Sequence, residues 1–215
     1  MGSPTIAGCG ASARTRGRPS STLFPDPPPG RLIVMSGPSG AGKTSVVEGL
    51  SQRMPFHFSV SMTTRPARPG ETDGVDYHFV TRDRFAAAIE AGELAEWASY
   101  GGNLYGTPVA EFDHRAAGED VLADIEMVGA RTIKSLYPEA VMIFVAPPSL
   151  AEVERRLRER GDTTEEDIGR RLEIADDQMR EAVTLFDHIV VNDDLNTAID
   201  RVAGILRVPH RPDPS

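Results

Sequence analysis

The fold of this chain is decided by the stretch Gly37-Pro38-Ser39-Gly40-Ala41-Gly42-Lys43-Thr44, which matches the phosphate-loop pattern G-x-x-x-x-G-K-[ST] in full. An apolar run over residues 32–35 precedes it, and a helical pattern over residues 44–54 follows it. This is the strand–loop–helix context in which such a loop works. The stretch therefore predicts a bound nucleoside triphosphate.

Each residue type in this loop suits phosphate binding. Glycines let successive backbone N–H groups turn toward phosphate oxygens, and the start of the following helix adds positive potential. Lys43 reaches the β- and γ-phosphates as a compact point charge, while Thr44 offers its hydroxyl to Mg²⁺. An ordinary glycine-rich turn would need none of these features together.

Composition excludes several classes of protein. The 215 residues are 40% hydrophobic and 26% charged, which suits one compact domain with inserted lobes. No apolar run approaches the ~20 residues that a membrane-spanning helix needs. The net charge of −9 argues against nucleic acid as a partner. One cysteine, Cys9, and five scattered histidines predict neither a disulfide nor a metal cluster, and the cysteine usage favours the cytoplasm.

The basic residues are almost all arginine. Of 23 lysines and arginines, only Lys43 and Lys134 are lysines. The first belongs to the phosphate loop, whereas Lys134 has no motif around it and is interpreted as a solvated surface residue. Lysine at position 43 therefore reflects the chemistry of the phosphate loop rather than the composition of the chain.

The two ends of the chain differ from its body. Residues 1–30 are rich in Pro, Gly and Ser and lack apolar periodicity, so they are predicted to form a disordered and inert arm. Residues 209–215 form a similar tail. The body, residues 31–208, alternates apolar runs with amphipathic helical patterns, which predicts an α/β fold with a central parallel sheet covered on both faces. The strands are expected at 32–35, 121–125, 141–145 and 189–191, and the helices at 44–54, 128–136, 149–160 (opened by a Ser149/Glu152 capping box) and 197–206.

Residues 56–106 interrupt this alternation. Short strands over 58–60, 77–80 and 94–100, with a hairpin turn at Gly101-Gly102, predict a small mixed α/β lobe inserted into the body. In this lobe Arg65 and Arg68 stand three apart in a loop stiffened by proline. Two planar guanidinium groups held there suit a phosphate dianion, although a solvated basic turn is an equal alternative from the arginines alone.

Two further motifs carry a family resemblance. They are Gly74-Val75-Asp76-Tyr77-His78-Phe79 and Glu96-Trp97-Ala98-Ser99-Tyr100-Gly101-Gly102-Asn103-Leu104-Tyr105-Gly106-Thr107. Together with Pro38-Ser39-Gly40 in the phosphate loop, they resemble the guanylate kinase family, bacterial type, over residues 31–206. The resemblance implies a P-loop core (31–59, 116–149 and 174–208), a GMP-binding lobe (60–115) and a helical lid (150–173).

The resemblance also implies the roles of individual residues. ATP would be held by residues of the phosphate loop through Ser45 and by Asn192. GMP would be held through its phosphate by Arg65, Arg68, Tyr77 and Tyr105, and its guanine would be read by Ser61, Glu96 and Thr107. The catalytic positive charges would be Lys43 and the lid residues Arg156, Arg160 and Arg171. Asp124 and Glu126 would face GMP and the magnesium ion or its waters from the end of a strand.

Three positions depart from the usual family pattern. Glu126 stands where Asp is usual, which keeps the charge but lengthens the side chain. Thr44 differs from the family's usual residue after the loop lysine but keeps its hydroxyl, and Thr107 replaces the more common Ser, again keeping a hydroxyl. The role of Glu126 is the one that these departures leave open.

The expected activity is transfer of the γ-phosphoryl group of MgATP to GMP, as part of GMP recycling and guanine nucleotide supply. The attacking phosphate is already ionised, so no general base is needed and catalysis rests on alignment and charge neutralisation. The partners are small molecules, with neither nucleic acid nor membrane expected. Alternatives are a kinase of another phosphorylated acceptor, a phosphoprotein-binding module without catalysis, and a P-loop NTPase.

Overall fold

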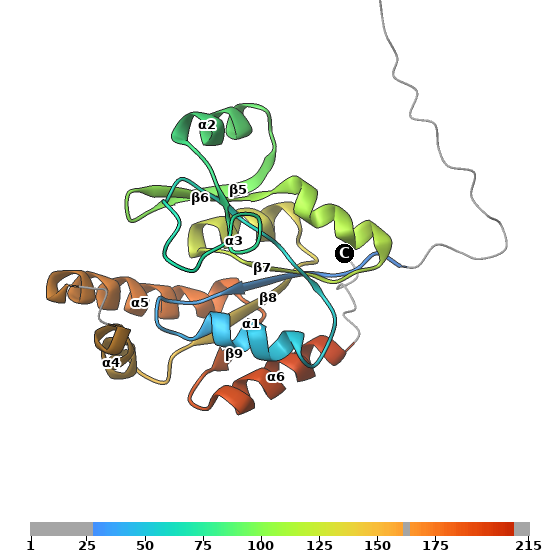
Figure 1. Cartoon of the computed structure of the whole chain (residues 1–215). Helices are drawn as coiled ribbons and strands as arrows, with labels where there is room; N and C mark the ends of the chain where they lie inside the picture. Colours follow the sequence, from blue (N-terminus) through green and yellow to red (C-terminus); the bar gives the residue numbers. More distant parts are fainter. Residues whose placement is uncertain (1–27, 161–163, 209–215) are drawn as a thin grey trace, which may run out of the picture.

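The structure is a computed structural model that describes residues 28–160 and 164–208 (Figure 1). Most of the predicted arm and the whole predicted tail lie outside the described residues. Gly30, which the sequence assigns to the arm, is buried: its N–H donates to the carbonyl of Arg115 at 2.8 Å, and Nε of Arg115 donates to the carbonyl of Gly30 at 3.1 Å. The packed body therefore already includes Gly30.

The core of the molecule is a five-stranded parallel sheet, as predicted. Its strands lie in the order β2-β7-β1-β8-β9, and every neighbouring pair is parallel. The strands are β1 (Leu32–Ser36), β2 (His57–Phe58), β7 (Val121–Asp124), β8 (Val141–Ala146) and β9 (His188–Val191).

Helices cover both faces of this sheet. Successive side chains of the central strands point to opposite faces, and those on both faces are apolar. Leu32 and Val34 of β1 point to the face covered by α3 (Met127–Leu136), α5 (Glu165–Leu185) and the 3₁₀ helix η1 (Val109–Ala117). Ile33 and Met35 point to the other face, covered by α1 (Lys43–Ser51) and α6 (Leu195–Arg207). All four side chains are fully buried, as the continuous apolar run of residues 32–35 predicts.

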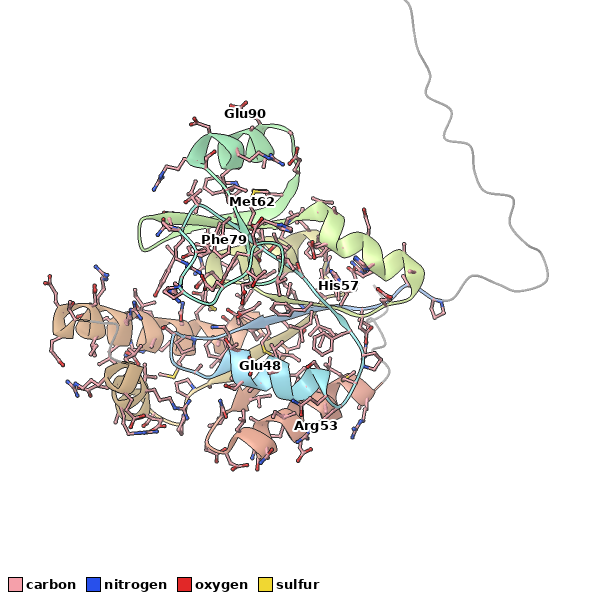
Figure 2. The ribbon with its side chains drawn as sticks, in the orientation of Figure 1. Glu48, Arg53, His57, Met62, Phe79 and Glu90 are labelled. Atoms are coloured by element: carbon pink, nitrogen blue, oxygen red, sulfur yellow. The ribbon has the colours of Figure 1, made fainter. Side chains whose placement is uncertain are left out.

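The inserted lobe is a four-stranded mixed sheet in the order β4-β3-β6-β5. It comprises β3 (Met62–Thr63), β4 (His78–Phe79), β5 (Leu94–Tyr100) and β6 (Asn103–Pro108), with α2 (Arg82–Glu90) packed on it. Tyr100 pairs with Asn103, which confirms the Gly101-Gly102 hairpin turn. The lobe has its own small core, and Figure 2 places Met62 and Phe79 in the lobe, across the central sheet from Glu48 and Arg53 on and just after α1.

The sequence places one strand in the wrong sheet. It predicts residues 58–60 as part of the lobe, but the strand is β2, and it pairs in parallel with β7 at the edge of the core sheet. The backbone continues this ladder, since the N–H of Ser59 donates to the carbonyl of Leu122 at 2.9 Å. A two-residue strand carries too little periodicity to indicate its partner.

Two helices lie in the segment that the resemblance predicts as the lid. α4 (Leu150–Arg160) packs on the first half of α5 through Val153, Leu157, Ile168 and Leu172. The predicted capping box is only half formed: the Ser149 hydroxyl accepts from the N–H of Glu152 at 3.2 Å, but the Glu152 carboxylate pairs with Arg155 and Arg156. α5 runs unbroken through the predicted lid boundary at 173/174 into the core. No helix of the described ranges is long and apolar enough to cross a membrane.

Lys134 is not the solvated surface residue that the sequence suggests. Its ammonium donates to both carboxylate oxygens of Asp187, at 3.0 and 3.3 Å. Asp187 also accepts from the backbone N–H of Met142 at 2.9 Å. Lys134 is thus linked through Asp187 to the first residues of β8.

Candidate active site

The phosphate loop connects the end of β1 to the start of α1, as predicted. Gly42 is the N-cap of α1 with φ 87°, a left-handed conformation that favours glycine. A Cβ at Gly42 would lie 2.4 Å from Nδ2 of Asn192, and one at Gly37 would lie 2.3 Å from the carbonyl oxygen of Val145. The loop thus requires glycine both for its conformation and for its packing against β8 and the residue after β9.

Lys43 lies among groups from two neighbouring strands. Its ammonium donates to the carbonyl of Gly37 at 2.8 Å and lies 3.9 Å from Oδ1 of Asp124. Burial raises the pKa of Asp124, and the charge of Lys43 opposes this. The pKa of Glu126 is likewise raised by burial, opposed by Lys43 and reinforced by Asp124. One ammonium and two carboxylates therefore share the carboxyl end of β1 and β7.

The site also offers ligands for a metal. Thr44 and Ser45 are exposed in the first turn of α1, and Asp124 lies beside Lys43. Among the described residues, no three His, Cys, Asp or Glu side chains converge to hold a metal ion by themselves. Mg²⁺ commonly binds through one or two protein oxygens together with substrate phosphates. The hydroxyl of Thr44 and the carboxylate of Asp124 fit this mode of binding.

A buried carboxylate lies in the lobe. Glu96 of β5 stands opposite Thr107 of β6, and the Thr107 hydroxyl donates to Oε1 of Glu96 at 2.6 Å. Glu96 is 6% exposed and Thr107 is fully buried. Burial raises the pKa of Glu96 to about 7, opposed by the hydrogen bonds from Thr107 and reinforced by the charge of Glu126. The pair is a fixed acceptor in a site that excludes water.

The lobe also brings together the predicted phosphate-binding residues. The Arg65 guanidinium lies over the ring of Tyr77, 5.4 Å from its centroid, and the rings of Tyr77 and Tyr105 meet edge to face. Burial raises the pKa of Tyr77 to about 12, and the negative charge of Asp124 reinforces this. Tyr77 therefore lies within reach of the charge of Asp124.

Glu71 orients this arginine, and the sequence gives it no role. Its two carboxylate oxygens accept from Arg65 at 2.9 and 2.8 Å, and one of them accepts from the backbone N–H of Arg68 at 2.6 Å. This pairing raises the pKa of Arg65. The side chain of Arg68 is exposed, and Ser61 lies just before β3, where its carbonyl accepts from the N–H of His78 at 2.9 Å.

Arg156 of α4 contacts the phosphate loop directly. Its guanidinium donates to the carbonyls of Gly40 at 3.1 Å and Ala41 at 3.4 Å, and to that of Asn192 at 3.2 Å. The buried amide of Asn192 donates to the same Ala41 carbonyl at 2.7 Å. Arg156 and Asn192 together hold the loop by its carbonyl groups.

The other lid arginines are placed differently. Arg160 is the last residue of α4, and its side chain lies outside the described part of the structure. Arg171 of α5 is half-buried, and its positive charge acts on the pKa of Tyr100 in the lobe. Burial and the charge of Glu126 raise the pKa of Tyr100, while Arg171 and Lys43 oppose this rise. Tyr100 lies four residues after Glu96 on β5 and hence on the same face of the strand, which makes it a further candidate that the sequence analysis did not single out.

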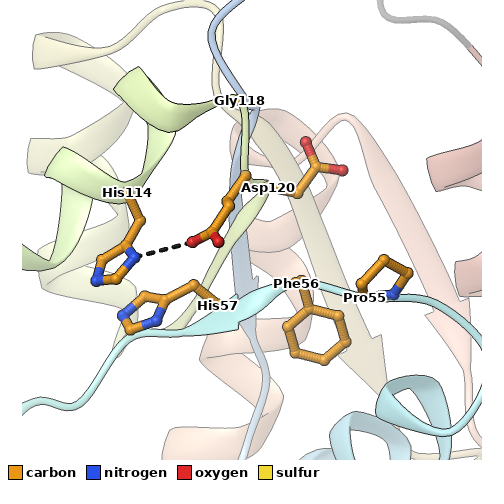
Figure 3. A pocket seen from close by; sticks show the side chains of 7 residues that line it. Pro55, Phe56, His57, His114, Gly118 and Asp120 are labelled. Carbon is orange, nitrogen blue, oxygen red and sulfur yellow. Dashed lines mark hydrogen bonds and ion pairs between the residues drawn. The ribbon is translucent and has the colours of Figure 1, made fainter.

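A separate hollow of about 610 Å³ lies at the opposite, amino-terminal edge of the sheet (Figure 3). Pro55, Phe56 and the stacked rings of His57 and His114 contribute to its wall. Its carboxylates are already paired, Glu119 with His114 and Asp120 with Arg31. The hollow shares no residue with the phosphate loop.

Comparisons with known proteins agree with this geometry. A family model described as guanylate kinase matches residues 29–208. A guanylate kinase from Synechococcus sp. strain JA-3-3Ab is 50% identical over 189 residues, covering 86% of this chain and 87% of that protein. One from Thermus thermophilus is 49% identical over 183 residues, covering 85% and 83%. The crystal structure of guanylate kinase from Anaplasma phagocytophilum matches with a TM-score of 0.69 and 32% identity, covering 86% of this chain and 89% of that one.

Proposed function

The chain belongs to the guanylate kinase family, and from this membership we infer that it transfers the γ-phosphoryl group of ATP to GMP, giving ADP and GDP. The observation that carries this inference beyond the family name is the buried Glu96–Thr107 pair in the lobe that accompanies the complete phosphate loop. A phosphate loop binds any nucleoside triphosphate, whereas a buried carboxylate selects the acceptor.

Glu96 is suited to guanine because of what its carboxylate can accept. Guanine presents two adjacent donors, N1–H and the exocyclic amine, and adenine does not offer that pair. A site built for such donors rejects the wrong base by leaving its own buried polar groups unpaired. Ser61 and Thr107 would complete the reading of the base. Arg65, Arg68, Tyr77 and Tyr105 would hold the GMP phosphate, with Glu71 fixing the orientation of Arg65.

The donor side follows from the phosphate loop. Residues 37–45 would bind the phosphates of ATP through their backbone N–H groups, Pro38 excepted because it has none, and through the ammonium of Lys43. Arg156 and Asn192 keep the loop in shape through its carbonyl groups. Thr44, with Asp124 nearby, would hold Mg²⁺. When bound, this ion neutralises charge on the β- and γ-phosphate oxygens.

The transfer itself needs alignment more than covalent chemistry. We propose that an oxygen of the GMP phosphate attacks the γ-phosphorus in line while the bond to the β-phosphate oxygen breaks. The positive charges of Lys43, Arg156, Arg160 and Arg171 would stabilise the transferring group. Asp124 and Glu126 would orient the acceptor side. Closing of the lobe and the lid around both nucleotides would keep water out and limit hydrolysis of ATP.

The remaining expectations are also proposals. The enzyme would work in the cytoplasm on free nucleotides, in the recycling of GMP, with neither nucleic acid nor membrane as a partner.

The test is ADP release from MgATP by the purified protein with GMP, dGMP, AMP, CMP and UMP offered separately. We expect strong dependence on GMP and little response to AMP. ADP release without any acceptor would instead indicate an NTPase. A preference for another monophosphate would indicate a kinase of a different acceptor, and GMP binding without ADP release would indicate a binding module.

A further inference from the structure

Gly129 lies where the core meets the buried carboxylate of the lobe. It is the third residue of α3, is buried, and follows Glu126, which is the N-cap of that helix. Figure 1 shows α3 between the lobe sheet and the core sheet. A Cβ atom on Gly129 would lie 2.0 Å from Oε2 of Glu96, 2.6 Å from its Cδ and 2.7 Å from Cγ2 of Ile125.

We propose that Gly129 is a positioning residue for guanine selection: its missing side chain is what allows the Glu96 carboxylate to sit at the depth where it reads the base. This inference rests on the proposed function of Glu96. It assigns to α3 a part in choosing the acceptor, in addition to carrying Glu126 at its start.

The geometry leaves Glu96 little freedom to adapt. Oε1 is held by the Thr107 hydroxyl at 2.6 Å, and Oε2 occupies the space over Gly129. A methyl group there would overlap the Glu96 carboxylate most severely and would also lie 2.7 Å from Cγ2 of Ile125, so either these side chains shift or α3 does. The carboxylate ends a flexible side chain, whereas α3 is packed into the core through Met127, Ala130 and Ile133. The larger movement is therefore expected at the Glu96 carboxylate, with a smaller shift of the Ile125 side chain.

The consequence falls on specificity rather than on phosphate binding. Displacement of Glu96 would break or misdirect the hydrogen bonds to guanine and leave Thr107 without its acceptor. The phosphate-binding group of Arg65, Tyr77 and Tyr105 and the phosphate loop are not among the nearest atoms that a Gly129 side chain would meet. A change at Gly129 should thus separate reading of the base from binding of phosphate.

The test compares Gly129→Ala with Gly204→Ala in the full chain. Both glycines are helical, but Gly204 is exposed on α6 and a Cβ there would meet nothing within 4 Å. Steady-state assays give KM and kcat for GMP, ATP and AMP, and thermal unfolding gives the melting temperature. For Gly129→Ala we expect the GMP KM to rise roughly tenfold or more and the preference for GMP over AMP to fall by a similar factor. The ATP KM should change by less than about twofold. Gly204→Ala should match the wild type.

A size-compensating variant distinguishes positioning from general damage. Glu96→Asp shortens the side chain by one methylene, so in the Gly129→Ala background it withdraws the carboxylate from the added methyl. We expect the double variant to select GMP better than the product of the two single effects allows. Additive effects, or a Gly129→Ala enzyme that keeps its GMP KM and preference, would overturn the proposal. If instead the wild type does not prefer GMP, the proposed function itself fails, and that outcome is visible before any variant is made.

Discussion

The hydroxyl of Thr107 donates a 2.6 Å hydrogen bond to Oε1 of Glu96, and both side chains are buried between the lobe sheet and α3. The bond joins directly opposed residues of adjacent antiparallel strands, so the hairpin that turns at Gly101-Gly102 sets its geometry. A carboxylate held this way keeps one oxygen bonded to protein and leaves the second facing α3. Its charge, its position and its surroundings can each be tested.

The first prediction concerns pH and GMP binding. Burial raises the pKa of Glu96 to about 7, and only the ionised carboxylate can accept from both guanine donors. Between about pH 6 and pH 8 the ionised fraction of Glu96 therefore rises about tenfold, and we expect the GMP KM to fall by a comparable factor. The GMP phosphate also undergoes its second ionisation at about pH 6. The Glu96→Gln variant keeps the pH dependence that comes from the GMP phosphate and loses the part that comes from Glu96. A Glu96→Gln variant with the wild-type pH profile would therefore contradict the assignment.

The second prediction concerns stability without nucleotides. A carboxyl group whose pKa is higher in the folded than in the unfolded state stabilises the fold at low pH, and this contribution is lost as pH rises toward the folded pKa. Between about pH 5 and pH 8 the wild type should lose up to about 3 kcal/mol of unfolding free energy relative to Glu96→Gln. Urea unfolding at both pH values measures this. A difference that stays constant with pH would mean that Glu96 is ionised throughout.

The third prediction concerns Arg156. Replacing it with Ala removes its hydrogen bonds to the carbonyls of Gly40, Ala41 and Asn192, so the phosphate loop loses support. We expect the ATP KM to rise roughly tenfold, with Arg156→Lys only partly restoring it because lysine lacks the planar fork. Arg155→Ala is the matched control, since Arg155 is on the same helix and pairs with Glu152 and Glu159. Equal effects of the two Ala variants would argue against a specific role for Arg156.

The fourth prediction uses the two lysines. Lys43→Met should lower kcat by roughly 10³-fold while leaving the fold intact, because the ammonium contacts the loop and would neutralise the transferring charge. Lys134→Met should leave kcat near the wild-type value and lower the melting temperature, since Lys134 ties α3 to Asp187 away from the phosphate loop. Near-normal turnover of Lys43→Met would defeat the mechanism.

The sequence predicts the parts of this structure that depend on local pattern. The apolar runs of β1, β7 and β8 and the phosphate loop before α1 follow from composition and spacing, and the resemblance places the lobe. One error falls on an element too short to carry a pattern: β2 has two residues, and only its pairing with β7 shows which sheet it joins. β3 is equally short, and no sequence pattern indicates it. The sequence analysis also leaves out the nine-residue helices α2 and η1.

The site shows the same division. The residues of the phosphate loop can be named from their types and spacing, whereas those of the lobe can be named only through the family resemblance. The partners of Lys134 and Arg156 cannot, because Asp187 lies 53 residues from the former and Gly40 lies 116 residues from the latter. Glu71 and Gly129 escape the sequence for a related reason: their importance lies in what they orient or leave room for, which only packing reveals.

The central claim is that the phosphoryl group passes from ATP to GMP. The most direct measurement is to incubate the enzyme with MgATP labelled in the γ-phosphate and with GMP, and to identify the labelled product. We predict that the label appears in GDP as fast as ADP is formed, with little in inorganic phosphate. Label that accumulates in inorganic phosphate at the same rate with and without GMP would contradict the account.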